Sequence, residues 1–334
     1  MASVQLQNET LDMDTTKTFK LQYEDMLRGF LRDISFKIPS SRYDPSIESA
    51  VLKYFRSRDF TPDFIQRYTS VIHAGVWIAT STYPFVPAKV QEEIAIYTSL
   101  VVMVEDASKE YLTDIKLFQD RLFRKQPQPI PLLETTIHSL HTLRGLYGPF
   151  ISDMMMKATL EFISVCAFEQ EYNEIFSDSS STPEFPYYLR LKTGLAEVYA
   201  FFAFPECMYP EEVFLRMYLP TVPYIVRYLN LGNDFLSFYK ESIVSDERLN
   251  YVHNYSRAND LTPIQVLQDT CSSLANCVRI VRKALAADPQ LCNHFEQFFH
   301  GYVAYHFGAG RYKLSELGIP EIDQVREHVC CPRY

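Results

Sequence analysis

Glycine is scarce in this chain, where it accounts for 10 of 334 residues. Nucleotide-binding α/β folds depend on glycine-rich turns, and the sequence contains neither GxGxxG nor GxxxxGK followed by Ser or Thr. Alternating strand patterns rich in β-branched residues are scarce as well. Apolar residues instead recur every three or four positions, as at Met156, Leu160 and Ile163, which predicts helices almost throughout.

Basic residues are in deficit, with 32 Lys and Arg against 41 Asp and Glu and a net charge of −9. Nucleic acid is therefore not an expected partner, because phosphate backbones are bound by basic surfaces. The deficit does not argue against a small diphosphate ligand, since bound metal cations supply positive charge locally.

Paired cysteine motifs, a signal sequence and a membrane-spanning run are all missing. The seven cysteines are irregularly spaced without CxxC, which supports neither a zinc site nor a disulfide framework. The N-terminus is polar and acidic, unlike a secretory signal. The most apolar stretch, Ile94–Val104, is too short to cross a bilayer. We therefore expect a cytoplasmic protein without a membrane span.

The chain does have the material for a large helical core, with 47% hydrophobic and 22% charged residues. Short breaks rich in Pro or Ser separate the expected helices, at residues 39–41, 83–87, 125–129 and 177–183. None of them is long enough to be a domain linker. Thr262–Pro263 has the pattern of a helix start. We predict one all-α domain over residues 19–334, preceded by a loosely ordered segment, residues 1–18.

The most informative stretch is Asn233–Glu241, which reads NDFLSFYKE. On a regular α-helix, Ser237 lies about 40° and Glu241 about 80° around the axis from Asn233. An amide, a hydroxyl and a carboxylate on one stripe are oxygen ligands suited to Mg²⁺. Lys240, at about −20°, shares the stripe and can contact a phosphate. The alternative is a polar stripe of an ordinary surface helix.

A second acidic cluster, Glu105–Glu110, follows the apolar stretch that ends at Val104. Asp106 and Glu110 are four residues apart, so on one helix they share a face and can bridge cations. This spacing favours Asp106 over Glu105 as the main ligand. Glu105 and Lys109 have the same spacing, which would also suit a helix salt bridge.

Two further segments carry groups suited to a diphosphate. Arg311–Tyr312 closes a stretch that begins at Gly301, and His306 is the histidine near this pair. Arg190 precedes Asn233 by 43 residues and is followed by Thr193–Gly194. A glycine there frees the backbone to move or to point a carbonyl inward. Taken alone, the arginine would be read as a surface ion pair and the glycine as a packing contact.

Together these segments resemble the trichodiene synthase-like branch of fungal sesquiterpene cyclases, over residues 60–315. Asn233–Glu241 matches in full the (N/D)Dxx(S/T)xx(K/R)E motif of class I terpene cyclases. Arg190 matches the family's diphosphate-sensing arginine, and Arg311–Tyr312 matches its C-terminal RY pair. The chain departs from the family at Glu105–Glu110, where DDxxD is expected, and at Tyr305, where tryptophan is expected.

The resemblance implies a class I terpenoid synthase bundle of helices around an apolar cavity that binds three Mg²⁺ ions and a linear isoprenyl diphosphate. It assigns as metal ligands Asp106, Glu110, Asn233, Ser237 and Glu241, with Glu169 as a further candidate. It assigns as catalytic groups that bind the departing diphosphate Arg190, Lys240, Arg311 and Tyr312. Aromatic faces stabilise carbocations, and the candidate cavity walls are Trp77, Tyr97, Phe201, Phe202, Phe238 and Tyr305.

The expected function is that of a sesquiterpene synthase, which ionises farnesyl diphosphate with Mg²⁺ and cyclises it to a hydrocarbon or alcohol. One alternative is a terpene cyclase for another prenyl chain length, and another is a catalytically impaired isoprenoid-binding protein. A chain-elongating prenyltransferase would need two DDxxD motifs, and this chain has neither. Members of the family often dimerise, so a homodimer is compatible with the resemblance.

Overall fold

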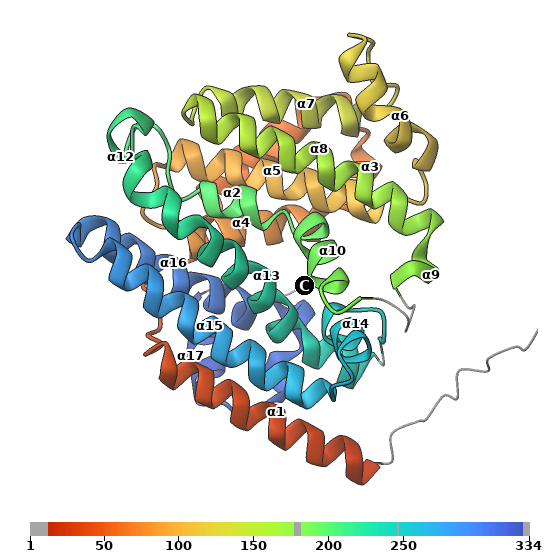
Figure 1. Ribbon diagram of the computed structural model, residues 1–334. Helices are drawn as coiled ribbons and strands as arrows, with labels where there is room; N and C mark the ends of the chain where they lie inside the picture. Colours follow the sequence, from red (N-terminus) through yellow and green to blue (C-terminus); the bar gives the residue numbers. More distant parts are fainter. Residues whose placement is uncertain (1–12, 177–181, 246, 330–334) are drawn as a thin grey trace, which may run out of the picture.

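The computed structural model describes residues 13–176, 182–245 and 247–329. Over these ranges the chain forms helices joined by short turns, and no strand is present among them (Figure 1). The predicted all-α fold is therefore confirmed. None of the described helices is both long and apolar enough to cross a membrane. Three stretches lie outside the described residues: residues 1–12 of the expected loose segment, residues 177–181 of an expected break, and residues 330–334 at the end of the expected domain.

Two groups of helices pack against each other (Figure 1). The first contains α2 (Pro45–Arg56), α3 (Pro62–Arg67), α4 (Thr69–Thr82), α5 (Ala88–Asp106), α6 (Leu112–Phe123), α7 (Pro131–Arg144) and α8 (Pro149–Glu171). The second contains α1 (Met13–Asp33), α13 (Val222–Phe238), α15 (Pro263–Leu285), α16 (Pro289–Gly308) and α17 (Pro320–Val329). Contacts of α4 with α16 join the two groups.

Shorter helices complete the bundle, and four of them, α9 to α12, carry the chain from α8 in the first group to α13 in the second, whereas α14 joins α13 to α15. They are α9 (Asn173–Phe176), α10 (Phe185–Thr193), α11 (Ala196–Phe201), α12 (Glu211–Tyr218) and α14 (Tyr251–Ala258). Single turns also occur, at η1 (Leu219–Thr221), η3 (Gly310–Tyr312) and η4 (Leu314–Glu316), and a π-helix, η2 (Tyr239–Val244), continues α13. In Figure 1, α9, α10 and α14 lie together at the right-hand side.

Helix boundaries follow the signals in the sequence at several places. Thr262 caps α15 with a full capping box, in which its side chain and that of Gln265 bond each other's backbone N–H. The break at residues 83–87 separates α4 from α5 as predicted. The start of the fold differs, since α1 begins at Met13 and residues 13–18 are helical rather than loose. Tyr23 of α1 ties this helix to the core by donating to the Phe235 carbonyl at 2.9 Å.

The crossing of α4 and α16 depends on a glycine. A Cβ added to Gly301 would lie 1.9 Å from the Ser81 carbonyl oxygen, so the two backbones touch here. Next to this crossing, the fully buried Trp77 donates from Nε1 to the Tyr305 carbonyl at 3.1 Å and lies against Gly308. The crossing fixes the position of the C-terminal half of α16.

We expect Gly301→Ala to lower the free energy of unfolding by about 1–3 kcal/mol or more, because backbone must move to admit the methyl group. Gly29→Ala is the matched control. Gly29 lies inside α1 with no atom closer than 3.9 Å to its added Cβ, and this change should raise the same free energy by about 0.4–1 kcal/mol. Urea denaturation measures both, and equal effects of the two substitutions would contradict the close approach.

Candidate active site

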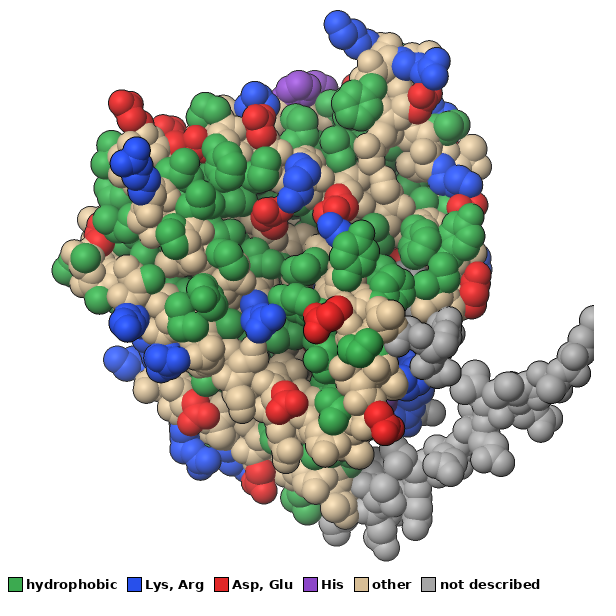
Figure 2. Space-filling model, viewed as in Figure 1, with side chains coloured by type: hydrophobic (Ala, Val, Ile, Leu, Met, Phe, Trp, Pro, Cys, Tyr) green, Lys and Arg blue, Asp and Glu red, His purple; other side chains and the backbone are tan. Residues whose placement is uncertain are grey.

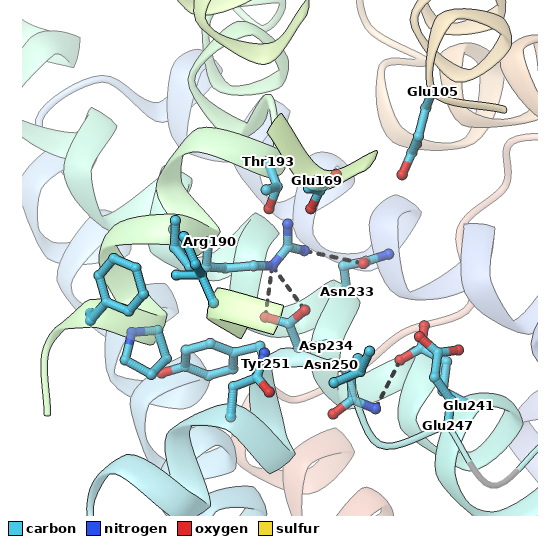
Figure 3. A pocket seen from close by; sticks show the side chains of 16 residues that line it. Glu105, Glu169, Arg190, Thr193, Asn233, Asp234, Glu241, Glu247, Asn250 and Tyr251 are labelled. Carbon is cyan, nitrogen blue, oxygen red and sulfur yellow. Dashed lines mark hydrogen bonds and ion pairs between the residues drawn. The ribbon is translucent and has the colours of Figure 1, made fainter. Parts of the chain in front are cut away.

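Two neighbouring pockets lie where α5, α10, α13 and the end of α16 meet. The acidic pocket, drawn in Figure 3, is named for Glu105, Glu169, Asp234, Glu241 and Glu247 in its wall. The tyrosine pocket is named for Tyr199, Tyr302, Tyr305 and Tyr312. The two share Glu105, Arg190, Thr193, Asn233 and Glu241, so they form one site. Their volumes of ≈ 190 and ≈ 270 Å³ together are in the range of small-molecule sites, about 300–1,000 Å³.

The outer surface around this region carries no single dominant charge. Figure 2 shows acidic and basic side chains scattered among hydrophobic ones over the same face as Figure 1. The concentration of carboxylates is therefore a property of the pocket rather than of this face of the molecule.

The structure brings Asn233, Ser237 and Glu241 into one wall of the tyrosine pocket. Asn233 and Ser237 lie one turn apart on α13, and Glu241 lies on the π-helix that follows. The buried Ser237 is hydrogen-bonded to the Glu241 side chain. Because all three present oxygen, this donor set fits a hard cation such as Mg²⁺.

Lys240 does not reach either pocket wall. The stripe calculated for a regular α-helix ends at Phe238, because the next six residues are π-helical. Consistent with the wider turn, the Ser245 N–H donates to the Lys240 carbonyl, five residues earlier, at 3.0 Å. Within this π-helix, Glu241 lines both pockets, whereas its neighbour Lys240 lines neither.

In the acidic cluster at the end of α5, the carboxylate that faces the site is that of Glu105 and not that of Asp106, which the sequence favoured. The helix ends at Asp106, and Glu105 lines both pockets whereas Asp106 lines neither. Glu110 lies in the turn beyond the helix and pairs with Arg67 at 3.0 Å on the surface. The four-residue spacing of Asp106 and Glu110 therefore does not place them on one face, because that rule holds only while a helix continues.

Carboxylates outnumber cationic side chains in the wall of the acidic pocket. Burial, and then the charge of Glu105, raises the pKa of Glu169 to about 7. Partial desolvation between the pocket walls also raises the pKa of Glu105, although its side chain is solvent-accessible. Neither side chain has a hydrogen-bond or ion-pair partner among the described residues. A bound cation would relieve this repulsion by favouring the charged forms.

The donor set is mixed in character. Among the residues that the structure describes, no three His, Cys, Asp or Glu side chains lie close enough together to hold a metal by themselves. The amide of Asn233 and the hydroxyl of Ser237 are therefore needed to complete a site opposite Glu105. Such neutral oxygen donors are normal for Mg²⁺, which also keeps several waters and uses substrate phosphates.

Arg190 is held by a residue that the sequence analysis did not single out. Its Nε donates to both carboxylate oxygens of Asp234, at 2.8 and 2.9 Å, and its Nη2 donates to Oδ1 of Asn233 at 3.2 Å (Figure 3). The Arg190 and Asp234 side chains are only 13% and 11% exposed. The charge available for a diphosphate is thus anchored to α13, next to the oxygen donors.

The helix break after Arg190 has another cause than the one expected. Gly194 has φ −89°, which any residue adopts, and the left-handed backbone is at Leu195, with φ 48°. A Cβ on Gly194 would lie 2.0 Å from Oδ1 of Asn230 and 2.6 Å from Nη1 of Arg190. Glycine is therefore needed for close approach, and the unusual backbone angle is carried by its neighbour.

Arg311 and Tyr312 lie in the turn η3 directly after α16, and both line the tyrosine pocket. The Arg311 guanidinium lies over the Tyr312 ring, 5.5 Å from its centre, which is cation–π geometry. Arg190 lines the same pocket from α10. Two arginines from distant segments therefore face the space beside the oxygen donors.

His306 lies behind Asn233 and is fully buried. Its ring is enclosed by those of Tyr302, Tyr305 and Tyr312, with centroids 4.7, 5.0 and 4.5 Å away. Burial lowers the pKa of His306 to about 3, so the ring is neutral. Its Nδ1 lies 2.9 Å from the Tyr302 carbonyl oxygen, and its Nε2 lies 3.4 Å from Nδ2 of Asn233.

Of the six aromatic cavity candidates, Tyr305 alone lines one of the two pockets. The others fill the core between helices, where their large rings bury the most apolar area. Tyr97 bonds Thr159 at 2.7 Å, and Phe238 stacks on Phe19; the remaining three, Trp77, Phe201 and Phe202, are also buried. The tyrosine pocket is walled instead by Ile78, Thr98, Val101, Val102, Phe162, Leu195, Tyr199, Leu229 and Tyr302.

Comparison with known proteins agrees with this geometry. Residues 53–329 match the family model described as Trichodiene synthase (TRI5). The chain is 57% identical over 316 residues to an (E)-beta farnesene synthase of Metarhizium brunneum, covering 95% of this chain and 96% of the relative. It is 28% identical over 293 residues to terpene synthase BipA of Cochliobolus sativus, covering 85% and 87%.

Among solved structures, a linalool/nerolidol synthase of Streptomyces clavuligerus superimposes with a TM-score of 0.61. The match covers 81% of this chain and 99% of the other, at 14% sequence identity. At this level of identity the likeness establishes a shared fold.

Proposed function

Because the chain belongs to the trichodiene synthase family and is thus a class I terpene synthase, we propose that it converts farnesyl diphosphate into a sesquiterpene. One observation carries the proposal. The oxygen donors of α13 and η2 line a single pocket together with Arg190 and Arg311, beside a wall of apolar and tyrosine side chains. A pocket with one charged end and one apolar end fits a prenyl diphosphate.

The charged end would be built from two kinds of group. Asn233, Ser237 and Glu241, opposite Glu105, would hold Mg²⁺, which when bound would supply Lewis-acid stabilisation of the leaving diphosphate. Arg190 and Arg311 would bind phosphate oxygens through directed N–H groups. The count of three ions, a phosphate contact by Lys240, a cytoplasmic location and a homodimer stay predictions from the resemblance.

The apolar end of the pocket would bind the hydrocarbon chain of the substrate. Val101, Phe162 and Leu229 exclude water from it, which protects a cation from early capture. The ring faces of Tyr199 and Tyr305 can stabilise positive charge without forming a bond to it. Ring closure in this space would give the cyclic product that the family resemblance implies.

A linear product is the second candidate. The Metarhizium relative is named for farnesene, an open-chain C15 hydrocarbon, and is 57% identical to this chain over 316 residues. Loss of a proton from the first allylic cation, before any ring closes, would give such a product. Both candidates use the same substrate and the same charged groups.

The test is incubation with geranyl, farnesyl and geranylgeranyl diphosphates, with and without Mg²⁺, followed by gas chromatography of the volatiles. We expect a C15 hydrocarbon or alcohol from farnesyl diphosphate that requires Mg²⁺, and its retention behaviour and mass spectrum separate cyclic from linear products. The proposal is refuted if farnesyl diphosphate gives no metal-dependent terpene.

Glu105→Gln should reduce turnover far more than Asp106→Asn, since only Glu105 lines the pockets. We expect a loss of about 10²-fold or more for Glu105→Gln, equivalent to about 2.7 kcal/mol of transition-state stabilisation, and less than about tenfold for Asp106→Asn. Steady-state kcat/KM with farnesyl diphosphate measures both. The reverse order would restore Asp106 as the main carboxylate of α5.

A further inference from the structure

The amide of Asn233 can serve a cation in only one of its two orientations. An amide oxygen is an acceptor and can bind a metal ion, whereas the NH₂ group is a donor and cannot. A rotation of the side chain by half a turn would exchange the two and remove the ligand. Something in the structure must therefore hold the amide with its oxygen toward the pocket.

His306 meets this requirement on the far side of the amide. Its Nδ1 lies 2.9 Å from the carbonyl oxygen of Tyr302, one turn earlier on α16. A carbonyl only accepts hydrogen bonds, so Nδ1 must carry the proton. Three tyrosine rings enclose the fully buried imidazole, and burial among them disfavours the charged form. In the uncharged ring Nε2 is an acceptor, so Nδ2 of Asn233, which it faces at 3.4 Å, must be the donor.

Arg190 imposes the same orientation from the other side. Its Nη2 has only hydrogens to offer and lies 3.2 Å from Oδ1 of Asn233 (Figure 3). A flipped amide would place two donors together at Arg190 and two acceptors together at His306. If Nη2 of Arg190 bound a phosphate oxygen instead while Nε stayed on Asp234, His306 would be the contact that still holds the amide.

We propose that His306 is a positioning residue that fixes the amide of Asn233 with its oxygen toward the cation site. Three tyrosine rings and the Tyr302 carbonyl hold the imidazole in place, so it has no freedom to follow a flipped amide. Groups that orient metal ligands in this way are worth about 10–100-fold in metal affinity. The proposal rests on the proposed function only in taking Asn233 as a metal ligand.

The test measures metal affinity directly, by titrating Mn²⁺ into the protein with inorganic diphosphate present and following free Mn²⁺ by electron paramagnetic resonance. His306→Leu should weaken Mn²⁺ binding by about 10–100-fold. His306→Gln, which keeps an acceptor oxygen, should retain most of the affinity. His300→Leu removes another buried histidine of α16, one that faces Glu296, and should bind like the wild type.

A second background keeps the test decisive if His306→Leu folds poorly. In Asn233→Asp both side-chain oxygens can bind a cation, so orientation no longer matters. The effect of His306→Gln or His306→Leu on Mn²⁺ affinity should then shrink, whereas a loss due to core packing would persist. Unchanged affinity in His306→Leu, or an equal loss in the wild-type and Asn233→Asp backgrounds, would overturn the proposal. Neither result depends on whether any prenyl diphosphate is turned over.

Discussion

The double substitution Asn233→Ala with Glu241→Ala is expected to reduce terpene formation from farnesyl diphosphate by at least about a thousandfold. Lewis-acid stabilisation of a leaving group is worth several kcal/mol, and each 1.4 kcal/mol or so changes the rate by about tenfold. Both side chains line both pockets, so their loss removes the amide and the carboxylate of the donor set while the hydroxyl of Ser237 remains. Excess Mg²⁺ should not restore the rate.

A matched control separates this effect from general damage. Asn276→Ala with Glu212→Ala removes the same two residue types from exposed positions outside both pockets. We expect this control to keep the rate of the parent, as measured by gas chromatography of the volatiles at saturating substrate. Survival of the product in Asn233→Ala with Glu241→Ala, at a rate near that of the control, would refute the assigned metal site.

Asp234→Leu is expected to lower the free energy of unfolding by about 3–5 kcal/mol, because it leaves the largely buried Arg190 without its anion. The contact is a strong one, with Nε of Arg190 within 2.9 Å of both carboxylate oxygens. Urea denaturation followed by circular dichroism measures the change. The metal-free protein should be used, so that no ligand shifts the equilibrium.

The double variant Arg190→Met with Asp234→Leu tests whether the stability lost in Asp234→Leu is due to the unpaired charge of Arg190 or to lost packing. Replacing both partners of a buried ion pair by apolar residues is often neutral or stabilising. We therefore expect the double variant to regain most of the stability lost in Asp234→Leu, although it should remain inactive. If the two losses simply add, the ion pair is not the cause, and the side-chain volume at position 234 would be the better account.

The motif of α13 could be found from the sequence because helical spacing and residue chemistry coincide there. Asn233 and Ser237 are one turn apart on a regular helix, and the structure places them in one pocket wall. Lys240 could not be placed in the same way, since the change from α to π geometry at Tyr239 leaves no clear mark in composition. A count based on 3.6 residues per turn fails beyond that point.

The end of α5 shows a second limit. Spacing rules favour Asp106, but they assume that the helix continues to Glu110, and it ends at Asp106. Acidic residues at a helix end do not reveal the last helical residue, and boundaries are the part of a helix least fixed by local sequence. Helix α5 packs on α4, α7 and α2, and the acidic cluster itself carries no sign of which carboxylate that packing turns toward the pockets.

Contacts between segments that are far apart in the sequence could not be predicted from local spacing either. Asp234 binds an arginine 44 residues earlier, and His306 meets an asparagine 73 residues earlier. The sequence around Asp234 and His306 contains no pattern that indicates these partners. The residues of the cavity wall could not be predicted for a similar reason. Composition shows that aromatic rings are plentiful, but it does not show which rings face the pocket and which fill the core.

The buried indole described at the crossing of α4 and α16 gives the molecule its own optical reporter. Trp77 is the one tryptophan in the sequence, and its N–H is bonded to the backbone of Tyr305, a wall residue of the tyrosine pocket. Its emission is therefore not mixed with that of other indoles. A shift in emission wavelength or lifetime on adding diphosphate and metal would register movement of α16 without label, dye or turnover.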